Sequence, residues 1–525
     1  MPEVSGRFVF LPLIGIELLL LAIALRSSRR LAGVARVLVF AVPLGLVLVL
    51  RAWQAFGVLG VLDWDETYYL SVAVTAAAGR GLYPYILGYG PMTAMGGIGY
   101  AAYLYAFAVR AFGPTILALR GVSLIASIAA LVGLWKLARL WYGSGSAWAA
   151  VAFAAAFRLF AQSNTVRMDS LAFAWTVWAL YCVALAWSRP VTRWRDLVAG
   201  VIFGIGLEVH IDTAVTAMAC CAVYLLLRRW RPLALFISGE LAAVVGYVCA
   251  NVLPDPSAFY RTAVLLRLGA TRGYSTGTNS LAGSFLNPAL LMAKEGAAYR
   301  ALWVNVPHIE IAIVLLAFAA AAWRRTHADR IALTLAGALL VAAAIVLDNA
   351  APEYFVHITP ALLVPVGALF AVGFARRDRL STAEVTPIAL TVFSLVIAVV
   401  IAGGQPAVIR TIVHGRDQIE ADRAFASQVR AVVDRRCTLA GDAGLYVRYF
   451  PDYPFFISTR RTEVTYAMLY FSSPSERAYW RLKRPDVVFG EHGLPDPLAS
   501  YVSDEHFEQR APNVWMRAGG CRGGP

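Results

Sequence analysis

The sequence predicts an all-α polytopic membrane bundle of about 12 transmembrane helices, followed by a small α/β domain. Composition is the first reason, because 59% of the 525 residues are hydrophobic, 15% are charged, and the mean hydropathy is +0.64. Soluble domains carry about 25% charged residues, so most of this chain suits a bilayer. The other two reasons are a series of long apolar segments and a change to mixed charge after residue 404.

Twelve apolar segments are long enough to be membrane spans, because a bilayer core needs about 20 residues of helix. They run through residues 9–25, 35–55, 118–137, 147–163, 170–187, 197–210, 213–227, 233–252, 308–323, 331–347, 357–375 and 386–402. The first segment follows a short start with a single arginine and no small-residue cleavage site. We therefore expect it to be a retained helix rather than a signal peptide.

Basic residues follow every odd-numbered segment. They include Arg29, Arg30, Lys136, Arg139, Arg193, Arg195, Arg228, Arg229, Arg324, Arg325, Arg376 and Arg377. Cytoplasmic loops of membrane proteins carry such an excess, so these turns are predicted to be cytoplasmic and both termini to lie outside. Topology thus accounts for the net charge of +14, and nucleic acid is not expected as a partner.

The outer side is predicted to hold two long loops and a terminal domain. Residues 56–117 are rich in Gly and Tyr and predict short interfacial helices, and residues 253–307 form the second loop. We divide the chain into a catalytic membrane domain, 1–404, and a soluble extracytoplasmic domain, 405–525, which is long enough to bury a small core. Cys437 and Cys521 both fall in the second domain and can pair if it is extracytoplasmic.

Three carboxylates follow the second apolar segment: Asp63, Asp65 and Glu66. Asp65 has a plain structural explanation, since aspartate is a good N-cap for a helix that begins at Glu66. Three neighbouring carboxylates also repel one another, which raises the pKa of at least one of them. A raised pKa suits a general base that takes a proton from an acceptor hydroxyl or amine, and carboxylate oxygens also suit a divalent cation.

Two further polar groups interrupt apolar sequence on the same predicted side. Arg167 and Asp169 form either an exposed ion pair or, facing Asp65, a site in which Arg167 contacts an anionic group. Residues 208–212 carry three ionisable side chains, each costing about 2.5–3.5 kcal/mol at a bilayer centre, so they face water or one another. His210 suits a metal ligand, a phosphate contact or a proton carrier, and an interfacial turn is the plainer alternative.

The order of these motifs resembles the GT-C superfamily of integral membrane glycosyltransferases, in the branch of protein O-mannosyltransferases and lipid A aminoarabinose transferases. The resemblance covers about residues 35–375. Its elements are Asp65-Glu66 with Tyr69, Gly81-Leu82-Tyr83-Pro84, Gly90-Pro91-Met92, Phe112-Gly113 with Arg120, Arg167-Met168-Asp169, Gly204-Ile205-Gly206-Leu207 with His210, and Tyr354 to Pro360. Gly90 stands where some relatives carry a lysine, and His210 takes the position of another frequent lysine.

This resemblance implies an enzyme at the outer face of the cytoplasmic (inner) membrane. It would transfer a sugar from a polyprenyl-phosphate-linked donor to a lipid, glycan or protein acceptor. Asp65 would be the base or acceptor-orienting carboxylate, and Glu66 and Asp169 would support it or share a divalent metal ion with it. The expected metal ligands are Asp65, Asp169 and His210. The expected substrate contacts are Tyr69, Tyr83, Arg167, His210, Tyr354 and His357.

Two other classes of protein were weighed against an enzyme. A transporter or flippase of a lipid-linked saccharide also buries charged residues, often near the midplane and in repeated halves. Here the carboxylates cluster near one predicted interface, and we find no internal repeat. A structural protein with a C-terminal binding module is the third possibility. Later candidates are Lys294, Arg300, His308, Asp348, Glu353, Tyr354 and His357. The cationic side chains among them suit contacts with a phosphate leaving group, and ordinary interfacial anchors are the alternative.

Overall fold

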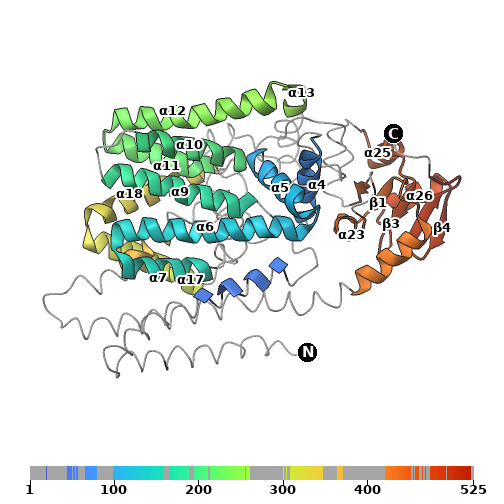
Figure 1. Ribbon diagram of the computed structural model, residues 1–525, viewed down its shortest axis with the longest axis horizontal. Helices are drawn as coiled ribbons and strands as arrows, with labels where there is room; N and C mark the ends of the chain where they lie inside the picture. Colours follow the sequence, from blue (N-terminus) through green and yellow to red (C-terminus); the bar gives the residue numbers. More distant parts are fainter. Residues whose placement is uncertain are drawn as a thin grey trace.

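The computed structural model of the chain has a long helical bundle with a smaller α/β part at one end (Figure 1). It describes residues 65–79, 99–157, 168–188, 194–210, 213–254, 256–260, 308–346, 420–450, 456–459, 473–491 and 493–521, with short pieces between 19 and 56, at 166, 300 and 303, over 363–369, and at 453, 464 and 468. The predictions for Asp63, Tyr83, Arg167, Lys294, Asp348, Glu353, Tyr354 and His357 lie outside these residues, as do most of the second outer loop and of the first and last predicted spans.

Among the described residues, helices coincide with the third to tenth predicted spans. They are α6 (Ile116–Tyr142), α7 (Ser144–Ala156), α9 (Met168–Ser188), α10 (Trp194–Val209), α11 (Thr213–Leu226), α12 (Trp230–Tyr247), α17 (His308–Arg324) and α18 (His327–Val346). In this part of the chain, three helices are long and apolar enough to cross a membrane: Ile116–Tyr142, Met168–Ser188 and Trp230–Val252. The fold is that of a helical, multi-pass membrane protein, and the number of 12 spans stays a prediction.

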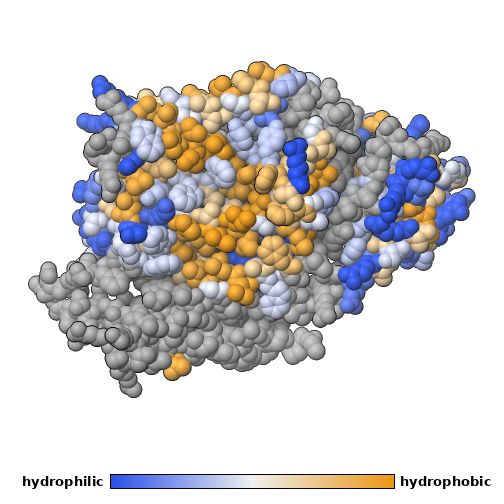
Figure 2. All heavy atoms as spheres, viewed as in Figure 1, coloured by the Kyte–Doolittle hydropathy of each residue, from blue (hydrophilic) through white to orange (hydrophobic). Residues whose placement is uncertain are grey.

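The flank of the bundle is apolar. Figure 2 shows hydrophobic side chains along it, between hydrophilic ones at its left end and on the C-terminal part. Phe107, Ile125 and Leu241 are among the exposed apolar residues. Monomeric soluble proteins rarely expose a broad apolar surface, so this flank suits contact with lipid.

Glycine lets α10 pack closely against its parallel neighbour α12. A Cβ atom on Gly200 would lie 1.9 Å from the carbonyl oxygen of Phe236, and one on Gly239 would lie 2.2 Å from that of Leu197. Backbone atoms cannot yield to such a contact, so a side chain at either glycine would push the helices apart. The contact holds the C-terminal ends of α10 and α12 side by side at one end of the bundle.

The helix α6 joins two polar regions at opposite ends of the bundle. Its first turn carries Arg120, beside α4 (Asp65–Ala77) and α5 (Gly99–Phe112). At its last residue, the Tyr142 ring centre lies 5.6 Å from the guanidinium of Arg324, at the basic turn between α17 and α18. Because α6 has 27 residues, it is about 40 Å long. The acidic motif and this basic turn therefore lie at opposite ends, which agrees with the charge pattern.

The C-terminal part of the chain has the α/β character that its composition predicted. Its five-stranded sheet has the order β2-β1-β3-β5-β4. The strands are β1 (Leu439–Gly441), β2 (Phe456–Ser458), β3 (Val487–Phe489), β4 (Phe507–Ala511) and β5 (Val514–Arg517). β1 is parallel to β2 and β3, and β5 is antiparallel to β3 and β4. The helices between them in sequence are α23 (Ala443–Tyr449), α25 (Glu476–Lys483) and α26 (Leu498–Asp504).

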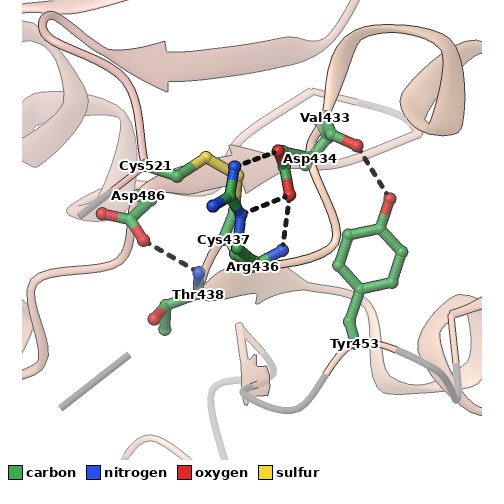
Figure 3. The surroundings of a disulfide bond; sticks show 8 residues. All are labelled: Val433, Asp434, Arg436, Cys437, Thr438, Tyr453, Asp486 and Cys521. Atoms are coloured by element: carbon green, nitrogen blue, oxygen red, sulfur yellow. Dashed lines mark hydrogen bonds and ion pairs between the residues drawn. A yellow bond between two sulfur atoms is a disulfide. The ribbon is translucent and has the colours of Figure 1, made fainter. Parts of the chain in front are cut away.

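A disulfide bond closes this domain. Cys437 and Cys521 are bonded across 84 residues, with their Cα atoms 4.9 Å apart, which confirms the predicted pair (Figure 3). Next to it, the Thr438 amide donates a hydrogen bond of 2.9 Å to the Asp486 carboxylate. The bond ties the residues before β1 to those after β5, so both ends of the domain are held at one place.

Candidate functional site

The acidic motif is anchored by a buried ion pair between Glu66 and Arg120. Glu66 lies in the first turn of α4, and both side chains have an exposed fraction of 0%. The Arg120 guanidinium donates two hydrogen bonds to the Glu66 carboxylate, from Nε to Oε1 over 2.9 Å and from Nη2 to Oε2 over 2.7 Å, and a third from Nη1 to the Ala55 carbonyl over 3.3 Å. A bidentate contact of this kind fixes the orientation of both groups as well as their separation.

The same carboxylate also holds the segment before α9. The backbone amide of Val166 donates to Glu66 Oε1 over 3.1 Å, across 100 residues of sequence. Val166 is followed directly by Arg167 and, two residues later, by Asp169. Glu66 therefore joins α4, α6 and the start of α9, which brings both predicted acidic motifs to one place. We assign it a positioning role in the site.

Asp169 lies in the first turn of α9, and 3% of it is exposed. It lies within electrostatic range of the Tyr105 hydroxyl on α5, as does Glu66. Burial raises the pKa of this phenol, and the two carboxylates raise it further, so it remains a hydrogen-bond donor at neutral pH. Its oxygen lies 3.2 Å from Ser123 Oγ, and its ring centre lies 6.3 Å from that of Tyr69.

Asp65 is the first residue of α4, directly before the Glu66 anchor. The capping interpretation expected a helix that begins at Glu66 with Asp65 as its N-cap, whereas α4 already includes Asp65. The side chain of Asp65 lies outside the described part of the structure. α23 of the C-terminal domain also contacts α4. The start of α4 is therefore held by α6 within the bundle and lies beside the C-terminal domain (Figure 1).

His210 lies at the turn that follows α10. It is 7% exposed, its amide donates to Gly206 over 2.8 Å, and its carbonyl accepts from the Thr213 amide over 3.0 Å. This places it at the same end of the bundle as Asp169, because α9 begins where α10 ends. Arg300 and His308 differ, since both are exposed and His308 stacks on Trp303 with ring centres 4.2 Å apart.

Sequence reasoning gave no role to Arg120 or Tyr105. Arg120 had a signal of its own, because an arginine inside an apolar run of 27 residues is expensive unless a carboxylate or a carbonyl meets it. Its partner could not be named, since any of several acidic residues fits the same rule. Tyr105 had no such signal, because tyrosines are common throughout residues 56–117.

A metal site was predicted at Asp65, Asp169 and His210. Among the residues that the structure describes, no group of three or more His, Cys, Asp or Glu side chains lies close enough to hold an ion. Asp169 and His210 belong to that described set, and the Asp65 side chain does not. The described donor set therefore does not fit a metal on its own, and we derive no step through one.

Comparison with protein families finds one match within the bundle. Residues 100–253 match the family described as dolichyl-phosphate-mannose-protein mannosyltransferase. The match begins at α5 and ends just after α12, so it includes Tyr105, Arg120, Asp169 and His210. Among curated protein sequences, none matches the chain.

Comparison with solved structures finds the same fold in ArnT from Cupriavidus metallidurans. The structure bound to undecaprenyl phosphate has a TM-score of 0.61 at 14% identity, covering 94% of this chain and 99% of that one. The apo structure has a TM-score of 0.62 at 13% identity, covering 92% and 98%. An oligosaccharyltransferase of Archaeoglobus fulgidus in complex with zinc and sulfate has a TM-score of 0.47 at 14% identity, covering 85% and 67%.

Proposed function

We propose that this chain is a GT-C glycosyltransferase of the membrane, and that it transfers a sugar from a polyprenyl-phosphate-linked donor to a lipid, glycan or protein acceptor. The observation that carries the proposal is the Glu66 anchor, which gathers the Asp65 motif and Asp169 at one end of a membrane bundle. A donor with a polyprenyl tail explains why the enzyme is embedded in a bilayer. The solved ArnT structure has undecaprenyl phosphate bound, and this lipid is of the class that the proposed reaction would release.

In the proposed reaction Asp65 is the base or the acceptor-orienting carboxylate. The acceptor hydroxyl or amine loses its proton to Asp65 and attacks the anomeric carbon of the sugar. The bond between that carbon and the phosphate oxygen breaks, and polyprenyl phosphate leaves with the electron pair. A positioned base of this kind contributes about 10²–10⁴-fold to a rate.

The other predicted residues are given supporting roles. Arg167 and His210 are proposed to meet the charge of the leaving phosphate, since cationic donors stabilise charge that develops in the transition state. Tyr69, Tyr83, Tyr354 and His357 are proposed to contact the substrates. Asp169, buried beside Tyr105, is proposed to support Asp65. A divalent metal ion remains a hypothesis for Asp65, Asp169 and His210 together.

The proposed location is the inner membrane, with the site and the C-terminal domain on the extracytoplasmic side. The disulfide between Cys437 and Cys521 supports this side, because such bonds persist in oxidising compartments. The α23–α4 contact supports a common side for the site and the domain. The basic turn at Arg324 lies at the other end of α6, as the positive-inside bias requires.

Asp65→Asn tests the assignment of the base. In purified full-length protein supplied with undecaprenyl-phosphate sugars and cell-envelope acceptors, we expect transfer to fall about 100-fold or more. Asp63→Asn is the matched comparison two residues away. It removes a neighbouring carboxylate but not the proposed base, so transfer should fall far less than in Asp65→Asn. A chelator in the same assay tests the metal hypothesis.

Two outcomes would contradict the proposal. Undiminished transfer by a folded Asp65→Asn variant would end the assignment of the base. Movement of the intact lipid-linked saccharide across proteoliposomes, with no transfer, would instead support the flippase alternative.

A further inference from the structure

A second group of polar side chains lies at the same end of the bundle, where α5, α10 and α12 meet. It comprises Glu208 in the last turn of α10, Tyr100 in the first turn of α5 and Tyr247 at the end of α12, and we call it the Glu208 cluster. The Tyr100 and Tyr247 ring centres are 5.9 Å apart with the planes at 61°. Both phenols lie within electrostatic range of the Glu208 carboxylate.

The surrounding backbone holds the two rings in place. A Cβ atom on Gly99 would lie 2.1 Å from the Tyr247 ring, so this ring rests directly on the start of α5. Beyond it, α12 ends in a π-helical turn, Val248–Val252, that carries Asn251. Asn251 is 3% exposed, accepts a hydrogen bond from Tyr103 and donates one of 3.3 Å to the Tyr247 carbonyl. Such π-turns are frequent at functional sites.

Among the residues that the structure describes, none forms a contact that explains the place of Glu208. Its side chain is half-buried, and no residue in the described part of the chain forms an ion pair or hydrogen bond with it. A partly desolvated carboxylate is costly unless hydrogen-bond donors or a cation meet it. The side chain is open enough to be reached from outside, so a ligand can supply those donors.

The two polar groups lie on one helix. Tyr105 on α5 lies beside Asp169 and Ser123, and Tyr100, five residues earlier, lies beside Glu208. Tyr100 and Tyr105 are about 140° apart around α5, so they face different sides of that helix. The link between the two groups runs through α10, because Glu208 lies two residues before His210, at the end of α10 that lies beside the start of α9 and Asp169. A sugar whose anomeric carbon lies at the Asp65 and Asp169 end can extend its far hydroxyl groups toward Glu208.

We infer that the Glu208 cluster recognises the hydroxyl groups of a neutral hexose on the lipid-linked donor, an inference that rests on the proposed function. The carboxylate accepts hydrogen bonds from two neighbouring hydroxyls, and the tyrosine rings pack against the apolar face of the sugar. Glu208 is thus a specificity residue, placed apart from the residues that act on the anomeric carbon.

Glu208→Gln tests this assignment without changing the size of the side chain. The dissociation constants of undecaprenyl phosphate and of undecaprenyl-phosphate mannose, glucose and galactose are measured on purified full-length protein in nanodiscs. The original protein should bind one hexose-bearing lipid more tightly than undecaprenyl phosphate. Glu208→Gln should reduce that preference roughly tenfold, because a hydrogen bond to a charged group is lost, and leave the binding of undecaprenyl phosphate unchanged.

Glu240→Gln is the matched control, since Glu240 is also half-buried but lies near the middle of the membrane-spanning segment Trp230–Val252. It should keep the preference for the hexose. Equal weakening of all four lipids by Glu208→Gln, an unchanged preference, or no preference in the original protein would each overturn the inference. Failure of the original protein to bind any of the lipids would instead refute the proposed function.

Discussion

Two ion pairs lie near opposite ends of α6. They differ in how far apart in sequence their two members are. Glu66 and Arg120 are 54 residues apart, and Val166, which shares the same carboxylate, is 100 residues from Glu66. Arg324 and Asp329 are neighbours across one turn, 3.5 Å apart. The first pair holds separate helices together at the candidate site, and the second organises a single turn at the opposite end.

The local pair belongs to a capping box. Asp329 accepts hydrogen bonds from the amide and the hydroxyl of Thr326, and its own amide donates back to that hydroxyl over 3.2 Å. Arg324 is 14% exposed, so water can replace its partner, whereas Arg120 is fully buried. Burial of both members makes the long-range pair sensitive to the loss of either one.

Arg120→Met should have the largest effect in this comparison. It leaves the Glu66 carboxylate buried without its guanidinium, which costs about 3–5 kcal/mol of the free energy of unfolding. Because α4 and the start of α9 lose their common anchor, sugar transfer should fall as well. Thermal unfolding in detergent and the transfer assay measure the two effects.

The control for Arg120→Met is Arg110→Met, which removes an exposed arginine with one hydrogen bond to a backbone carbonyl. It should change stability by at most about 0.5 kcal/mol. The double variant Arg120→Met with Glu66→Gln should recover part of the loss, because no charge is then left unpaired. Equal destabilisation by Arg110→Met, or a double variant as unstable as the sum of its parts, would contradict the anchor role.

Asp329→Ala should have a smaller effect that is confined to stability. Removal of a capping carboxylate costs about 1 kcal/mol, and the partly exposed Arg324 can turn to water. The candidate site lies about 40 Å away along α6, so the rate of transfer by the folded protein should not change. A loss of transfer without a loss of folded protein would show that the two ends of the bundle are coupled.

The same difference explains what the sequence could predict. The eight helices that coincide with the third to tenth predicted spans, the basic turns and the disulfide follow from local composition and residue type, which periodicity and charge reveal. The Glu66–Arg120 pair and the hydrogen bond from Val166 to Glu66 depend on helix packing between segments 54 and 100 residues apart. No spacing rule selects Arg120 over other basic residues. The gathering of Asp65, Glu66 and Asp169 could be expected only from their shared side of the membrane.

Lys483 extends the comparison to a partly buried charge in the C-terminal domain. Burial lowers the pKa of this amine to about 8, against about 10.4 in an unfolded chain. As the pH rises from about 8 to 10, the native state loses the proton before the unfolded state does. The native state is therefore stabilised over this window, and the full burial penalty applies below it.

Lys483→Met removes the penalty, so the variant should unfold at a higher temperature than the original protein at pH 7. The difference in unfolding temperature between the variant and the original protein should become smaller as the pH approaches 10, because the original protein then buries a neutral amine. Labelling supplies a direct check, since the chain has only three lysines, Lys136, Lys294 and Lys483. Amine modification followed by mass spectrometry should give Lys483 a midpoint near pH 8. A midpoint near 10.4, with a gap in stability that does not vary with pH, would mean that water reaches this charge as freely as it reaches an exposed lysine.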